Sequence, residues 1–122
     1  MKSITDEIRG RIKANLVEAR VFRRDSEWGQ CWELLEDAHI LSQPWGWWHT
    51  RVHTAMLLAG WKARDSREVR GQLLRLVVGG PASAVGRYPV GNTGRARVRA
   101  TQPMSVRSDL AEMLSRAGRP VG

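Results

Sequence analysis

Cysteine, phenylalanine and tyrosine each occur only once in this 122-residue chain, and histidine occurs only three times. Because the single cysteine, Cys31, cannot form a disulfide within the chain, we expect a reducing compartment such as the cytoplasm. The uncharged stretch 40–50 contains Ser, Gln, Pro and Gly and is too short and too polar to span a bilayer. The N-terminal residues show neither an apolar core nor a small-residue cleavage site, so the sequence predicts no signal peptide.

Acidic residues are also scarce. The chain has 12 Asp and Glu against 20 Lys and Arg, which gives a net charge of +8 and an isoelectric point near 11.2. An isoelectric point above about 9 is typical of nucleic-acid-binding domains. The arginines are nevertheless spread over every segment, and net charge by itself indicates solubility and non-specific attraction. A nucleic-acid partner is therefore an alternative hypothesis, not the leading one.

The remaining composition is that of an ordinary globular protein, with 42% hydrophobic and 26% charged residues. A chain of this length buries roughly two-thirds of its unfolded surface, which is enough for a core. We therefore expect a single domain spanning 1–122.

Apolar residues recur at helical spacing in several segments. The pattern predicts helices over 4–24, 27–42, 47–63 and 65–78, with a short last helix over 107–117. Thr5 and Ser26 are predicted to cap the first two helices, and Ser108 or Asp109 the last one. We expect the fourth helix to end at Gly79-Gly80-Pro81 and to bury its apolar residues, which are Val69, Leu73, Leu74, Leu76 and Val77. In the third helix, Leu58 is a further candidate for burial.

The expected fold is all-α, with two antiparallel helical hairpins followed by a long Gly/Pro loop over 81–106. The tripeptide Arg-Asp-Ser occurs at 24–26 and again at 64–66, and each copy lies between the two helices of a hairpin. A repeat offset of 40 residues would suit stacked hairpins of the tetratricopeptide kind. Chance reuse of capping residues in a simple bundle explains the pattern equally well.

All the histidines lie within fifteen positions, at His39, His49 and His53. Residues i and i+4 share a helix face, so His49 and His53 point the same way. If the helices around residue 45 form an antiparallel hairpin, residues at equal height have numbers that sum to about 90. His39 then lies opposite the gap between the other two. Imidazole is the commonest metal ligand in proteins, so the sequence predicts one transition-metal ion held by three nitrogens.

Additional ligands follow from the same helices. Glu36 lies one turn before His39 and could be a fourth ligand or could hold an imidazole N–H. Met56 and Cys31 would make the donor set softer and suit copper, whereas three nitrogens with carboxylate or water suit zinc, cobalt or nickel. The second Glu-x-x-His and the two further glutamates of a di-iron bundle are missing.

The functional hypothesis is a small intracellular protein for metal buffering, delivery or resistance. A zinc hydrolase with Glu36 as general base is an alternative, as is an interaction module. The histidines could also be structural, with hydrogen bonds to Glu36, Asp37, Gln43 or the backbone. Trp45, Trp47 and Trp48 would cover the helix ends or stack on a flat ligand. A homodimer is a further hypothesis, and no membrane partner is expected.

The segment 88–95, Tyr-Pro-Val-Gly-Asn-Thr-Gly-Arg, is the other motif of the chain. Asn92, Thr93 and Arg95 could form an anion-binding nest or a lid over the histidines. The segment matches neither a Walker loop nor a dinucleotide fingerprint. A rigid turn that holds the loop on the helices explains it without any ligand.

Four stretches together resemble an uncharacterised bacterial family of short proteins with a domain of unknown function. They are AHILSQ at 38–43, the His49-x-x-x-His53-x-x-Met56 pattern, REVRGQLLRL at 67–76, and PVGNTGRA at 89–96 with a later Pro-Met. The resemblance covers about two-thirds of the chain. It implies histidines at positions 39, 49 and 53 and an association with metal-resistance genes, but it implies no mechanism.

Overall fold

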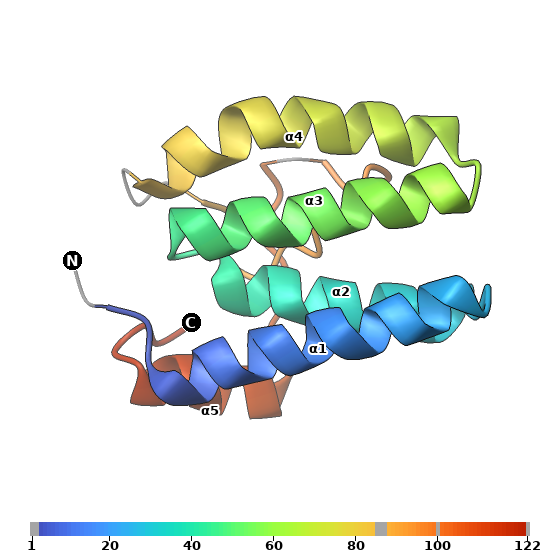
Figure 1. The fold of residues 1–122 in the computed structure, drawn as a ribbon. Coiled ribbons are helices and arrows are strands. Elements are labelled where there is room, and N and C mark those ends of the chain that lie inside the picture. The colour runs from blue at the N-terminus through green and yellow to red at the C-terminus, as the bar shows by residue number, and fades with distance from the viewer. Residues whose placement is uncertain (1–2, 85–87, 100, 122) are drawn as a thin grey trace.

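The computed structural model describes residues 3–84, 88–99 and 101–121, with the backbone alone for 78–84. This part of the chain is all-helical, as predicted, with α1 (Asp6–Arg24), α2 (Trp28–Ser42), α3 (Gly46–Lys62), α4 (Ser66–Ala84) and α5 (Ser108–Arg116) (Figure 1). None of the helices described here has the length and apolarity needed to cross a membrane.

The four long helices pack in the order of the sequence. α1 packs on α2, α2 on α3 and α3 on α4, while α5 lies against α1 and α2 (Figure 1). Burial of apolar side chains drives this packing, and the fully buried apolar residues include Ile8, Ile12, Leu35, Leu41, Val52, Met56 and Leu110. The predicted pair of consecutive hairpins is therefore present.

The two hairpin turns are equivalent, but not at the offset that the repeated tripeptide suggests. Arg24 and Lys62 end α1 and α3, and Trp28 and Ser66 begin α2 and α4, an offset of 38 residues in both cases. The residue with a left-handed backbone is Ser26 in the first turn and Arg64 in the second, each with φ of 57°. The two Arg-Asp-Ser copies thus occupy different places in their turns, which favours chance reuse of these residues over a 40-residue repeat.

Of the N-caps predicted for α1, α2 and α5, only the cap of α1 is confirmed. The Thr5 hydroxyl accepts a hydrogen bond from the Ile8 backbone N–H at 3.2 Å, as expected for an N-cap. α2 begins after Glu27 instead of Ser26, and α5 begins after Arg107 instead of Ser108 or Asp109. Neither of these two caps uses a side-chain hydrogen bond, so the predicted caps there were wrong.

The orientation of α4 is the largest departure from the sequence prediction. Leu73, Leu74 and Val77 are 50%, 63% and 74% exposed, whereas Glu68 and Gln72 are buried at 1% and 0%. Glu68 and Gln72 face inward because both form hydrogen bonds in the interior. A hydrophobic pattern does not report on such partners. Leu58 of α3 is also half exposed, contrary to expectation.

The sequence predicted that α4 would stop at Gly79-Gly80-Pro81. The helix instead runs past these residues and ends at Ala84. Proline removes a helical N–H bond and its ring crowds the preceding turn, yet α4 continues for three residues past Pro81. The following segment, described over 88–99 and 101–107, forms turns without helix or strand and passes behind α2 and α3 in Figure 1. Through Asn92 this segment contacts His39 of α2.

Candidate metal centre

Three imidazoles converge between α2 and α3. His39 comes from α2, and His49 and His53 come from α3; their side chains are 94% or more buried. His39 Nε2 lies 2.9 Å from His49 Nε2 and 3.1 Å from His53 Nε2, and the last two atoms are 3.0 Å apart. The three nitrogens form a nearly equilateral triangle. Among the described residues, this cluster is the one group of histidine, cysteine and acidic side chains able to hold a metal ion.

The hairpin register produces this triangle. α2 ends at Ser42 and α3 begins at Gly46, so the turn is centred near residue 44 and His39 lies level with His49. His53 follows one turn further along α3, and His39 Nε2 lies within 3.1 Å of the Nε2 atoms of both residues. The predicted arrangement, with one imidazole opposite a pair spaced at i and i+4, is confirmed. Trp45, the N-cap of α3, is buried in the turn, whereas Trp47 is 71% exposed.

The outer nitrogen of His53 is held by α4. His53 Nδ1 lies 2.6 Å from Gln72 Oε1. Gln72 Nε2 donates to Glu68 Oε2 and to the Gly94 carbonyl, both at 2.8 Å, so the amide oxygen of Gln72 must be the atom that faces His53. Since that oxygen can only accept, His53 carries its proton on Nδ1 and directs the Nε2 lone pair into the triangle.

The outer nitrogen of His39 is held by the loop. His39 Nδ1 donates to the Asn92 carbonyl at 2.7 Å. The Asn92 side chain in turn donates to the Arg99 and Gln102 carbonyls and accepts from Gly94 N–H, which fixes the backbone around it. A carbonyl can only accept, so His39 also presents a bare Nε2 to the triangle.

Burial keeps the imidazoles of His39 and His53 neutral. It lowers the pKa of His39 well below its ordinary value, and the neighbouring His53 and His49 lower it further. Burial likewise lowers the pKa of His53 to about 4, and the hydrogen bond to Gln72 offsets only part of this shift. Both side chains are therefore neutral at pH 7, which is the form that binds metals.

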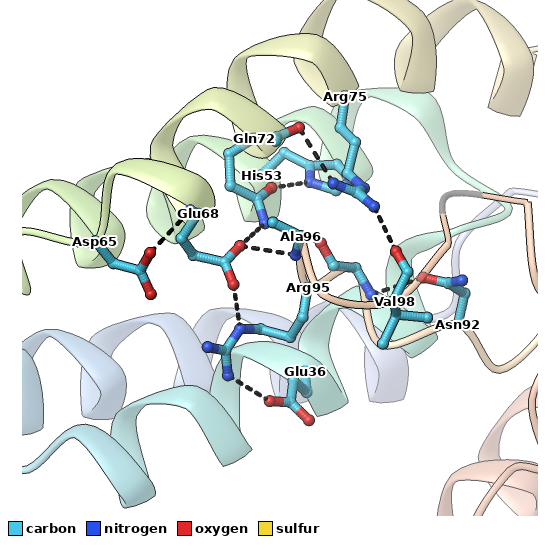
Figure 2. Close-up of polar contacts among 12 residues, drawn as sticks. Glu36, His53, Asp65, Glu68, Gln72, Arg75, Asn92, Arg95, Ala96 and Val98 are labelled. Carbon is cyan, nitrogen blue, oxygen red and sulfur yellow. Dashed lines mark hydrogen bonds and ion pairs between the residues drawn. The ribbon is translucent and has the colours of Figure 1, made fainter.

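A buried ion-pair network supports Gln72. Glu68 Oε1 accepts from Arg95 Nε at 2.6 Å, Glu68 Oε2 accepts from the Ala96 N–H at 2.9 Å, and Arg95 also reaches Glu36 at 3.2 Å. Figure 2 shows this chain of contacts running from His53 on α3 through α4 and the loop to α2. Arg95 also stacks 3.7 Å above the Trp32 ring. The network joins four separate segments around the histidines.

The predicted additional ligands lie in different surroundings. Glu36 contacts Arg95 and connects to His53 only through Arg95, Glu68 and Gln72. Cys31 and Glu36 are not in the group whose ligand atoms lie within 4.8 Å of one another. Met56 is fully buried in the core.

The loop motif lies over the histidines. Asn92 contacts His39 directly, as a lid would, and the guanidinium of Arg95 is engaged by two carboxylates. The Thr93 hydroxyl is buried without a hydrogen-bond partner among the described residues. This arrangement favours the lid over the anion nest.

The expected backbone hydrogen bond is present at His39, which donates to the Asn92 carbonyl. The expected side-chain partners of His39 and His53 were wrong. Gln43 donates to the Pro89 carbonyl and Asp37 pairs with Arg107, while Gln72 and Asn92 hold the imidazoles. One signal for Gln72 was available, because Glu68 and Gln72 stand at i and i+4 and so share a helix face.

A family model described as "Protein of unknown function (DUF3703)" matches residues 6–114. The chain belongs to this DUF3703 family. The resemblance to a family of unknown function is thereby confirmed, and the matched span includes the three histidines, Gln72 and Asn92. Comparison with curated proteins gave no match, and neither did comparison with solved structures.

Proposed function

We propose that this DUF3703 protein binds one transition-metal ion through the Nε2 atoms of His39, His49 and His53. The observation that carries the proposal is the contact between His39 Nε2 and His53 Nε2 at 3.1 Å. Both residues have their protons on Nδ1, so two lone pairs face each other across this contact with no hydrogen between them. A cation between the nitrogens turns this repulsion into coordination.

Hydrogen bonds cannot stabilise the three Nε2 atoms as well as a metal ion would. At most one hydrogen, on His49 Nε2, is available for three nitrogen–nitrogen contacts when all three rings are neutral. Protonation of His39 or His53 is opposed by the burial that lowers the pKa of both side chains. Unpaired polar atoms in such a buried site are costly, and a metal ion bound to all three nitrogens removes that cost.

The size of the triangle suits a first-row transition metal. Sides of 2.9–3.1 Å place each nitrogen about 1.7 Å from the centre of the triangle. Three imidazole nitrogens this close together could hold one ion with bonds of about 2.0–2.1 Å. Zinc, copper, nickel and cobalt all bind imidazole nitrogen at such distances.

The role that fits this site is metal buffering or delivery in the cytoplasm, in the context of metal stress. A buried site closed by a loop favours retention of the ion. An open coordination position would also allow a zinc-activated water, but the predicted base, Glu36, is ion-paired with Arg95. Binding is therefore favoured over hydrolysis.

Metal analysis of the untagged protein tests the proposal. Protein dialysed without chelator should carry, or take up on titration with Zn²⁺ or Co²⁺, one equivalent of metal. His49→Ala should lose this uptake, because the two remaining imidazole nitrogens are too few to hold the ion. Met56→Leu removes no proposed ligand and should retain the uptake. The proposal is wrong if the protein holds no metal and shows no thermal shift with zinc, copper, cobalt or nickel.

A further inference from the structure

A second site lies away from the histidines. A cavity of about 380 Å³ opens among α1, α2 and α3. Its apolar wall comes from all three helices and includes Leu16, Leu35, Ala55 and Leu58. Residues advance by about 100° along a helix, so Ala55 and Leu58 lie on the side of α3 opposite His49 and His53. The cavity is thus separate from the metal centre.

Three arginines line this cavity. Arg20 and Arg23 stand one turn apart on α1, and Arg51 approaches from α3. Within the described part of the chain, none of these guanidinium groups makes an ion pair or a hydrogen bond; Arg51 lies only over the Trp48 ring, at 4.9 Å. Three like charges around one opening repel one another, and a bound anion would offset that repulsion.

Among the residues that the structure describes, no acidic side chain lines the cavity. The remaining ionisable group there is Cys31, which is fully buried. Burial raises the pKa of the Cys31 thiol, so the thiol is neutral at pH 7 and adds no negative charge. The cavity therefore combines an apolar wall without negative charge with three positively charged arginines.

We propose that this cavity binds an amphiphilic anion, with an anionic head on the three arginines and a short aliphatic tail against the apolar wall. Arginine recognises both carboxylate and phosphate through paired N–H donors. The volume lies in the range of small-molecule sites and holds a chain of about eight carbons. The proposal goes beyond metal binding and does not depend on it.

Calorimetric titration of the full chain with octanoate and with octyl phosphate, at constant ionic strength, tests the proposal and distinguishes the two heads. At least one of the two anions should bind saturably, with a dissociation constant below about 5 mM. Octanol and acetate should bind at least tenfold more weakly. Arg23→Gln should weaken binding about tenfold. Arg67→Gln, an exposed arginine on α4, removes the same charge elsewhere and should leave binding unchanged.

Ala55→Leu should abolish binding without changing the charge, because the added side chain fills the cavity; a retained helical circular-dichroism spectrum would show that this variant folds. Binding should persist in the His49→Ala variant, so a failed metal proposal would leave this result intact. The proposal is overturned if neither anion binds, if octanol binds as tightly as the anions, or if Arg67→Gln weakens binding as much as Arg23→Gln.

Discussion

His53 Nδ1 and Gln72 Oε1 lie 2.6 Å apart, which joins a candidate metal ligand on α3 to the buried polar face of α4. The bond fixes both the tautomer and the ring orientation of His53. Because Gln72 is itself held by Glu68 and Gly94, the orientation of the imidazole depends on three segments that are distant in sequence. The ligand geometry is therefore a property of the whole fold.

Gln72→Ala should weaken metal binding without removing a ligand. Loss of the acceptor frees the His53 ring to rotate and to change tautomer, and such changes cost about 10- to 100-fold in metal affinity. Competition with a chromophoric chelator measures this affinity. Gln30→Ala, the same change at an exposed position of α2, is the matched control and should have no effect. Equal affinities for the two variants would contradict the role of Gln72.

Gly94→Ala should disturb both the loop and the site. Gly94 has φ of +83°, and an added Cβ would lie 2.5 Å from His39 Cδ2. The variant should unfold at a lower urea concentration and bind metal more weakly, because His39 must move. Gly29→Ala in α2 has open space around the new methyl group and should be neutral or stabilising. A Gly94→Ala protein with unchanged metal affinity would show that the loop does not press on His39.

Arg95→Leu should be strongly destabilising. It leaves the Glu68 carboxylate, which is 1% exposed, without its cation, and breaking a buried ion pair costs about 3–5 kcal/mol. Urea unfolding measures the free-energy change. Arg97→Leu, two residues along and exposed, makes the same chemical change and should cost less than about 0.5 kcal/mol. Similar losses in both variants would argue against the buried network.

Acidification should destabilise the metal-free protein below pH 6.5. The pKa of His53 is about 4 in the folded chain and near 6.5 when unfolded, so the unfolded state binds more protons between these values and stability falls as pH falls. The shift corresponds to roughly 3 kcal/mol, complete near pH 4. Urea unfolding at pH 7 and at pH 4.5 measures the loss. His53→Gln lacks the titrating group, so its free energy of unfolding should fall less between pH 7 and pH 4.5. An equal fall in both proteins would contradict a buried, neutral His53.

The histidine register followed from the sequence because it depends on local rules. Helical spacing pairs His49 with His53, and the short turn predicted around residue 45 brings His39 against them. Four helix positions, the last helix and the all-α class were predictable for the same reason, since apolar periodicity and turn residues report on local structure.

The surroundings of the histidines were not predictable. Gln72 and Glu68 lie on the face of α4 that has fewer apolar residues. Their burial is favourable because His53 and the loop residues Gly94, Arg95 and Ala96 supply hydrogen-bond partners. A hydrophobic pattern therefore placed Leu73 and Leu74 inside and these polar side chains outside. Contacts between segments more than twenty residues apart decide that orientation, and no local rule encodes them.

Nitrogen-15 NMR of the imidazoles, recorded while zinc is added to the metal-free protein, tests the central claim most directly. Before metal, His39 and His53 should show protonated Nδ1 and bare Nε2 atoms. With zinc, the Nε2 resonances of His39, His49 and His53 should move together and stop moving at one equivalent. The claim is contradicted if the Nε2 signals do not shift, or if only one of the three histidines responds.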